Sequence, residues 1–140
     1  MILLDTNVIS EPLTLRPDPA VVSWIDEQVI ETLYLSTISV TEMRYGIVVL
    51  PEGKKRDSLR VSLDERILPL FESRILPFDL AAAERCAELR RRARAAGQGV
   101  GITDSYIAAI AAARGLTVAT RDTQPYKAMG VDVINPWESE

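Results

Sequence analysis

Short apolar runs alternate along the chain with segments of helical periodicity, and this alternation restricts the fold more than any other feature of the sequence. Strands separated by helices build βαβ units, because parallel neighbours in a sheet can be joined only through a crossover. The alternation therefore predicts an α/β fold with a mostly parallel sheet between two layers of helices. The strand-like runs are residues 2–4 (ILL), 33–37 (LYLST), 74–78 (RILPF), 116–120 (LTVAT) and 131–135 (VDVIN).

Helical patterns fill the segments between these runs. Ser39-Val40-Thr41-Glu42 matches a capping box, in which Ser39 would be the N-cap and Glu42 would return a hydrogen bond to it. Asp79 can cap the helix that follows it. No linker rich in Gly, Ser or Pro divides the chain, so we expect one domain over residues 1–140. The helical stretches are residues 19–28, 42–49, a stretch after 53 that includes 59–70, 80–96 and 103–114.

Histidine is absent and cysteine occurs once, which removes several kinds of chemistry. Ser-His-Asp, Cys-His and paired-histidine mechanisms all need an imidazole, and structural zinc needs more Cys or His than this chain has. Any reaction must therefore use carboxylates, hydroxyls, Lys, Arg, Tyr or a metal held by oxygen atoms. Cys86 lies in a helical pattern and is expected to be a small core residue.

The overall charge and hydropathy indicate the setting in which the chain works. A net charge of −4 argues against non-specific nucleic-acid binding by the chain alone, because such binding depends on basic surface. The negative charge does not exclude an enzyme that binds the phosphates of its substrate through a metal ion. No window approaches the ~18 consecutive apolar residues of a membrane span, and no basic, apolar leader precedes the first strand. We therefore expect a cytoplasmic protein without a membrane partner.

Four acidic residues fall where the predicted topology would bring them together. Asp5 ends the first strand, and Asp122 follows the fourth. Glu42 and Asp104 are expected in the first turns of helices that follow the sheet edge. Ligands of open parallel sheets bind beyond the carboxyl ends of the strands. We therefore expect these carboxylates to converge on one patch.

Such a patch needs a cation to be stable. Two carboxylates about 5 Å apart at an effective dielectric near 20 repel by roughly 3 kcal/mol, so a group of four would take up protons or a metal. Oxygen ligands favour Mg²⁺ or Mn²⁺, which can activate a water for attack on phosphorus. Taken one at a time, each acid has a simpler explanation as a helix cap or turn residue. That explanation is weakest for Asp5, which follows an apolar run, and strongest for Glu42, which the capping box accounts for.

Taken together, the motifs resemble the PIN-domain ribonucleases, and among them the VapC/FitB type, the toxin half of bacterial toxin–antitoxin pairs. The resemblance covers essentially the whole chain, with each motif in the expected order. It implies a five-stranded parallel sheet and a Mg²⁺- or Mn²⁺-dependent endoribonuclease. It also implies a homodimer that a small DNA-binding antitoxin inhibits in a hetero-oligomeric complex. The motifs are MILLDTNVIS at 1–10, S-x-x-E at 39–42, TDSYIAAIA at 103–111, ATRD at 119–122 and VINPW at 133–137.

Carried over by position, the resemblance assigns roles to seven residues. Asp5 and Asp104 correspond to the principal metal ligands, and Glu42 and Asp122 complete the catalytic acidic pocket. The residues expected to orient carboxylates or water are Thr6, Asn7 and Thr120. The chain departs from the family pattern at one point, because many relatives have Asn at the position of Asp122 and an acid at the position of Pro125.

Four other functions are alternatives. One is a PIN-type nuclease without a toxin role, and another is a PIN fold retained as a non-catalytic binding module. A phosphatase or a receiver domain also places an acid after the first strand. A phosphatase of this kind needs a second acid where this chain has Asn7, and a receiver domain needs a Lys where this chain has Arg121.

We expect the arginines at 90–94 to form a solvated helix face and both tryptophans to pack in the core or at its edge. The segment 21–25 is a weak candidate for an apolar groove that receives an antitoxin helix.

Overall fold

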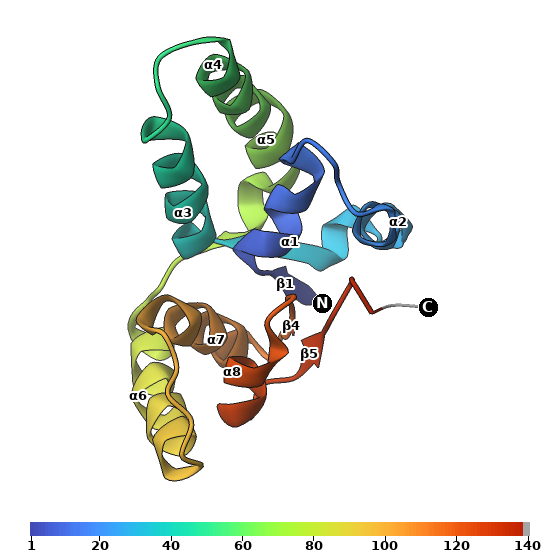
Figure 1. The fold of residues 1–140 in the computed structure, drawn as a ribbon. Coiled ribbons are helices and arrows are strands. Elements are labelled where there is room, and N and C mark those ends of the chain that lie inside the picture. The colour runs from blue at the N-terminus through green and yellow to red at the C-terminus, as the bar shows by residue number, and fades with distance from the viewer. Residues whose placement is uncertain (139–140) are drawn as a thin grey trace.

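The computed structural model describes residues 1–138, and over this range five parallel strands form one sheet in the order β3-β2-β1-β4-β5. The first strand in the sequence therefore lies at the centre of the sheet, as Figure 1 shows. This arrangement confirms the predicted α/β sandwich and each of the five predicted strands. The strands are β1 (Ile2–Leu4), β2 (Leu33–Ser36), β3 (Ile75–Leu76), β4 (Thr117–Ala119) and β5 (Val133–Ile134).

Helices cover both faces of the sheet. They are α1 (Thr6–Ser10), α2 (Pro19–Glu27), α3 (Thr37–Val48), α4 (Lys54–Val61), α5 (Leu68–Phe71), α6 (Leu80–Ala95), α7 (Ile102–Arg114) and α8 (Thr123–Ala128). Short 3₁₀ turns lie at η1 (Glu11–Leu13), η2 (Ile30–Thr32) and η4 (Glu72–Arg74), and a π-helical segment, η3 (Ser62–Ile67), joins α4 to α5. No helix in residues 1–138 is both long enough and apolar enough to cross a membrane.

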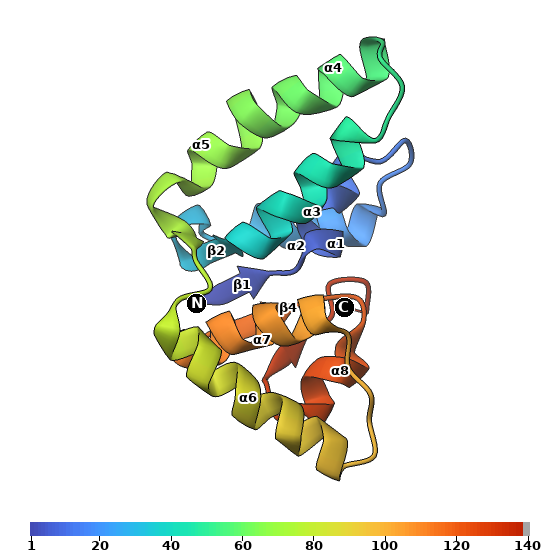
Figure 2. The same cartoon turned by 90° about the vertical axis from the view of Figure 1, so that its left-hand side faces the viewer.

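The alternation of side chains along β1 divides the core into two clusters. Leu3 packs with α6, α7 and α8 on one face, and Leu4 packs with residues of α1, α2, α3 and η3 on the other. The two layers of helices are visible on either side of the sheet in Figure 2. Successive residues of a strand point to opposite faces, so an uninterrupted apolar run is what a strand covered on both faces requires. Strand β1 therefore contributes to the core on both faces of the sheet, through Leu3 on one face and Leu4 on the other.

Most predicted helices are confirmed, and the start of α3 is a correction. Asp79 caps α6 as expected, because its Oδ1 accepts the N–H of Ala82 at 3.0 Å. The proposed capping box at Ser39 is wrong. The N-cap of α3 is Ser36, whose hydroxyl accepts the N–H of Ser39 at 3.0 Å, and Ser39 itself is a fully buried residue inside the helix. Strand β2 runs directly into α3, so the helix begins at Thr37, five residues earlier than predicted.

The helical stretch after Gly53 continues from Lys54 to Phe71, but its buried face shifts along the way. Leu63 is fully buried, whereas Leu70 is 55% exposed and Phe71 is only 2% exposed. The π-helical segment η3 has more residues per turn than an α-helix, which advances the buried face by one position. Two helices, α1 and α8, were not predicted, because each is one or two turns long and lacks a clear apolar period.

Candidate active site

Asp5 is buried where β1 meets α1. Only 5% of its surface is exposed, yet three donors reach its carboxylate. Its Oδ1 accepts the N–H of Thr6 at 2.7 Å, which makes Asp5 the N-cap of α1. Its Oδ2 accepts the hydroxyl of Thr120 at 2.9 Å and that of Tyr126 at 3.1 Å. These bonds offset the cost of burying the charge and fix the direction of the carboxylate.

Burial is the main cause of a raised pKa at Asp5, and the nearby charge of Glu42 adds to it. The hydrogen bonds from Thr120, Thr6 and Tyr126 act in the opposite direction, because they favour the charged form. The result is a carboxylate that is poorly hydrated but held in one orientation. Such a group gains much from a cation placed beside it.

Asp104 lies in the first turn of α7 and is half-buried. Its pKa is raised to about 6, first by burial and then by the negative charges of Asp5, Asp122 and Glu42. These electrostatic interactions place the four predicted acids around one site, as the sequence predicts. The N-cap of α7 is Gly101, which has no side chain to cap the helix. Asp104 is the acidic residue in the first turn of this helix.

Tyr126 joins the two principal acids and was missed in the sequence. It is fully buried on α8, where its hydroxyl donates its one hydrogen to Asp5, and its proximity to Asp104 lowers the pKa of that carboxyl slightly. Burial and the charges of Asp5 and Asp104 raise the pKa of Tyr126, so it stays a neutral hydrogen-bond donor. No local pattern around Tyr126 marks it as part of the site, because the contact joins α8 to the end of β1, 121 residues away.

Glu42 is exposed and lies in the second turn of α3 rather than the first. Its Oε1 accepts the hydroxyl of Thr6 at 2.5 Å, and the Thr6 and Ser39 hydroxyls lie 2.8 Å apart. Because a hydroxyl carries one hydrogen, Thr6 donates to Glu42 and accepts from Ser39. The explanation of Glu42 as a capping residue is therefore wrong, since Ser36 caps this helix. Contacts with α1 hold its carboxylate instead.

The remaining predicted residues form a hydrogen-bonded loop around Thr120. The Thr120 hydroxyl donates to Asp5 and accepts the N–H of Asp122 at 3.1 Å and the Nδ2 of Asn7 at 3.5 Å. The Oδ1 of Asn7 accepts the N–H of Arg121 at 3.3 Å. Asp122 is exposed, and among residues 1–138 its side chain makes no capping hydrogen bond to α8. Its carboxylate is thus the least constrained of the four.

The sequence and the fold both match proteins that are already known. Residues 2–130 match the family described as PIN domain. The chain is 52% identical to "VapC ribonuclease Y4jK" of Sinorhizobium fredii over 99% of each chain, and 50% identical to "Toxin FitB" of Neisseria gonorrhoeae over 98% of this chain and 99% of the relative. The chain belongs to the PIN-domain family. Within it, the chain is a toxin ribonuclease of the VapC/FitB type.

A solved structure agrees over the full length of the fold. The structure of FitAB bound to a DNA fragment superposes on this chain with a TM-score of 0.97, at 49% identity, covering 100% of this chain and 98% of that one. The strand order and the two helical layers are thus those of the VapC/FitB type, which confirms the fold that the resemblance implies.

PIN ribonucleases are typically metal-dependent enzymes, and the residues of this site fit a hard divalent cation. The available ligands are oxygen atoms, and burial and mutual repulsion disfavour the charged forms of Asp5 and Asp104. Within residues 1–138 no three Asp, Glu or Cys side chains lie close enough to enclose an ion. Mg²⁺ commonly binds through one or two carboxylates and keeps several waters. Asp5 and Asp104 are sufficient for this type of site.

Three other groups predicted to be structural have that role. Cys86 and Trp24 are buried in the core, and Trp137 packs at its edge with Arg121 stacked 5.2 Å from the ring centre. Val21 and Trp24 belong to the core on the inner face of α2, so these two side chains cannot line a surface groove on this helix. The arginines at 90–94 lie on an exposed helix face, as predicted.

Proposed function

We propose that this chain is a Mg²⁺- or Mn²⁺-dependent endoribonuclease, and the toxin of a type II toxin–antitoxin pair. The observation that supports the proposal most is the convergence of Asp5 and Asp104 on the hydroxyl of Tyr126. These acids are 99 positions apart in the sequence. An acceptor pair that is held this close, and whose charges repel, has a clear use only if a cation or a proton lies between its members.

In this proposal Asp5 and Asp104 hold the ion, which when bound supplies positive charge at the scissile phosphate and lowers the pKa of a water. Thr120, Tyr126 and the N–H of Thr6 keep the Asp5 carboxylate in place. Glu42 is exposed, and its Oε1 accepts the Thr6 hydroxyl, which leaves the second oxygen to take a proton from the attacking water. Asp122 adds negative charge at the rim of the site.

We also propose that the chain forms a homodimer and binds a small DNA-binding antitoxin in the cytoplasm. The relative FitB is paired with FitA on DNA in the structure that this chain resembles, which supports a similar pairing. The acidic site is a natural target for an inhibiting Arg, because a planar guanidinium can bridge two carboxylates. An inhibited complex is therefore expected to bind Mn²⁺ more weakly than the free chain does.

The test is cleavage of a defined RNA by the purified chain with Mg²⁺, Mn²⁺ or a chelator. We expect internal cleavage only with the divalent ion, and products with a 5′-phosphate, because water rather than the ribose 2′-hydroxyl is the nucleophile. Asp5→Asn is the control for a contaminating nuclease. Products that end in a 2′,3′-cyclic phosphate, or cleavage that persists in chelator, would contradict the proposal.

A further inference from the structure

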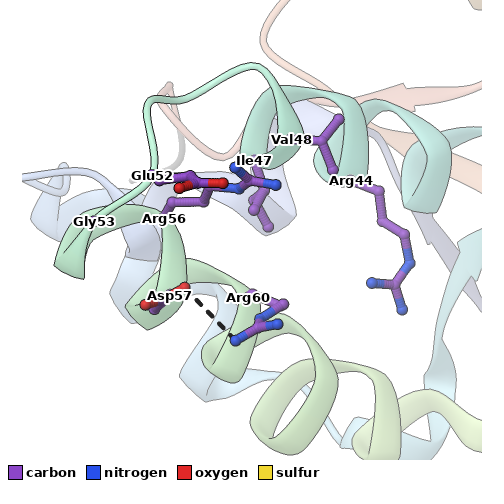
Figure 3. Close-up of a pocket in the computed structure, with 8 residues that line it drawn as sticks. All are labelled: Arg44, Ile47, Val48, Glu52, Gly53, Arg56, Asp57 and Arg60. Atoms are coloured by element: carbon purple, nitrogen blue, oxygen red, sulfur yellow. Dashed lines mark ion pairs between the residues drawn. The ribbon is translucent and has the colours of Figure 1, made fainter.

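Helices α3 and α4 enclose a cleft of about 350 Å³ that has no role in the site described above. Three arginines line it: Arg44 comes from α3, and Arg56 and Arg60 come from α4, as Figure 3 shows. The acids of the cleft are Glu52 and Asp57. The lining residues therefore carry a net positive charge in a chain whose net charge is −4.

The pairing of these arginines leaves donors available. Arg44 pairs with Asp64 at 2.6 Å, and Arg60 lies 3.6 Å from Asp57, both on exposed surface. Arg56 is half-buried and takes part in no ion pair within the described part of the chain. A guanidinium has five N–H donors, so one carboxylate contact does not saturate it. The two acids that line the cleft, Glu52 and Asp57, face three arginines, so guanidinium donors remain for a further anion.

The cleft is adjacent to the acidic site through a second hollow. This hollow of about 290 Å³ is lined at one end by Thr6 and Glu42 and along its floor by Met43, Ile47 and Leu63. Ile47 also lines the arginine cleft, so the two hollows are neighbours that share one side chain of α3. From Glu42 to Ile47 the helix rises only about 7–8 Å. An extended ligand at the acidic site can therefore reach the arginines along one helix.

We propose that the cleft of Arg44, Arg56 and Arg60 binds a backbone phosphate of the RNA strand that the acidic site cleaves. This inference rests on the proposed ribonuclease function and adds a substrate-binding site to it. The acids of the active site repel a polyanion, so binding of RNA requires cationic contacts elsewhere on the chain. Arginine suits this role because its planar fork matches two phosphate oxygens. The apolar hollow between the two sites offers a surface on which a base can pack.

The experiment measures binding of a fluorescein-labelled single-stranded RNA to the full chain in chelator, so that cleavage cannot interfere, at several salt concentrations. Arg56→Gln should weaken binding about tenfold, as expected for one lost charge-assisted contact. It should also reduce the slope of log K against log salt by about 0.7, the value for one phosphate contact on a single strand. In cleavage assays with Mn²⁺ the same variant should raise KM more than it lowers kcat.

Two further variants separate the site from general effects. Arg85→Gln removes the same charge from an exposed position on α6, on the opposite face of the sheet, and should leave affinity and salt slope unchanged. Arg56→Lys keeps the charge without the fork, so it should keep the salt slope and lose part of the affinity. Thermal unfolding of Arg56→Gln and Arg56→Lys, compared with that of the wild type, shows whether each variant is still folded.

The outcomes separate this inference from the proposed function. If the wild type cleaves RNA with Mn²⁺ but Arg56→Gln binds RNA as Arg85→Gln does, the phosphate site is wrong and the ribonuclease stands. If Arg56→Gln instead weakens only the complex with the antitoxin, the cleft binds protein and the inference is overturned. If the wild type neither binds nor cleaves RNA, the proposed function fails first and the inference fails with it.

Discussion

The four acids of the site form two pairs that differ in how the protein holds them. Asp5 and Asp104 are buried or half-buried, have raised pKa values, and lie on either side of Tyr126, whose hydroxyl donates to Asp5. Glu42 and Asp122 are exposed at the rim. The inner pair is fixed in place at a cost in solvation, which suits ligands of a cation. The outer pair keeps its water, and Glu42 is held by a single hydrogen bond from Thr6, which suits groups that move protons or steer substrate.

The largest effect should come from the inner pair. Asp5→Asn removes one negative charge and should abolish metal-dependent cleavage together with the rise in melting temperature on adding Mn²⁺. The protein should still fold, because Thr120 and Tyr126 carry hydroxyls that can turn to accept from the new amide. RNA cleavage and thermal unfolding with and without Mn²⁺ measure both effects. If Asp5→Asn still cleaved RNA, Asp5 would not be a required metal ligand, and the division into an inner metal-binding pair and an outer pair would be wrong.

The outer pair should matter through chemistry rather than metal binding. Glu42→Gln should keep the fold and the response to Mn²⁺ but lower kcat at least about 100-fold, because an amide cannot take up a proton. The matched control is Ser36→Ala, which removes the true N-cap of α3. It should cost about 1 kcal/mol of stability and leave most of the activity. Near wild-type cleavage by Glu42→Gln would reduce the site to Asp5, Asp104 and Asp122.

Replacing Tyr126 tests whether metal binding by Asp5 and Asp104 depends on the Tyr126 hydroxyl. Tyr126→Phe should weaken Mn²⁺ binding about 10- to 100-fold, the usual cost of losing a group that orients metal ligands. Titration calorimetry gives this affinity directly. Tyr106→Phe is the control, because it removes a hydroxyl from a half-buried tyrosine whose ring packs 4.7 Å from Phe78. Equal Mn²⁺ affinity of the two variants would show that Tyr126 only fills the core.

The smallest effect concerns stability without metal. Because the folded pKa of Asp104 is raised to about 6, the folded state binds more protons than the unfolded state between about pH 4 and 6. The stability contributed by this group is therefore highest at low pH and falls as pH rises through that window. Partial exposure of Asp104 screens the effect and keeps it modest.

Asp104→Asn should flatten that pH dependence, and at pH 7 it should make the metal-free protein equally or more stable. It should also remove the stabilisation by Mn²⁺. Denaturant unfolding at pH 4, 5, 6 and 7 in chelator gives the comparison. A variant that loses stability at every pH, yet responds fully to Mn²⁺, would mean that Asp104 only serves the N-terminus of α7.

Local patterns in the sequence determined the positions of the strands and the ends of two helices. Short, mainly apolar runs predicted the five strands, because strands covered by helices on both faces bury most of their side chains. Turn glycines at 97 and 115 gave the ends of α6 and α7, since both have positive φ. The convergence of Asp5 and Asp104 also followed from topology, because β1 ends at the sheet edge where α7, the helix that leads into β4, begins.

Only the tertiary structure decided how each acid is held. Whether Ser36 or Ser39 caps α3 depends on where β2 ends, and two serines three residues apart offer the same local signal. Nothing near Tyr126 in the sequence shows that its hydroxyl reaches Asp5, 121 residues away. The cleft of Arg44 and Arg56 likewise exists only because α4 folds back beside α3. Sequence fixes local periodicity and caps, whereas burial, distance and the sharing of donors arise when separate elements pack together.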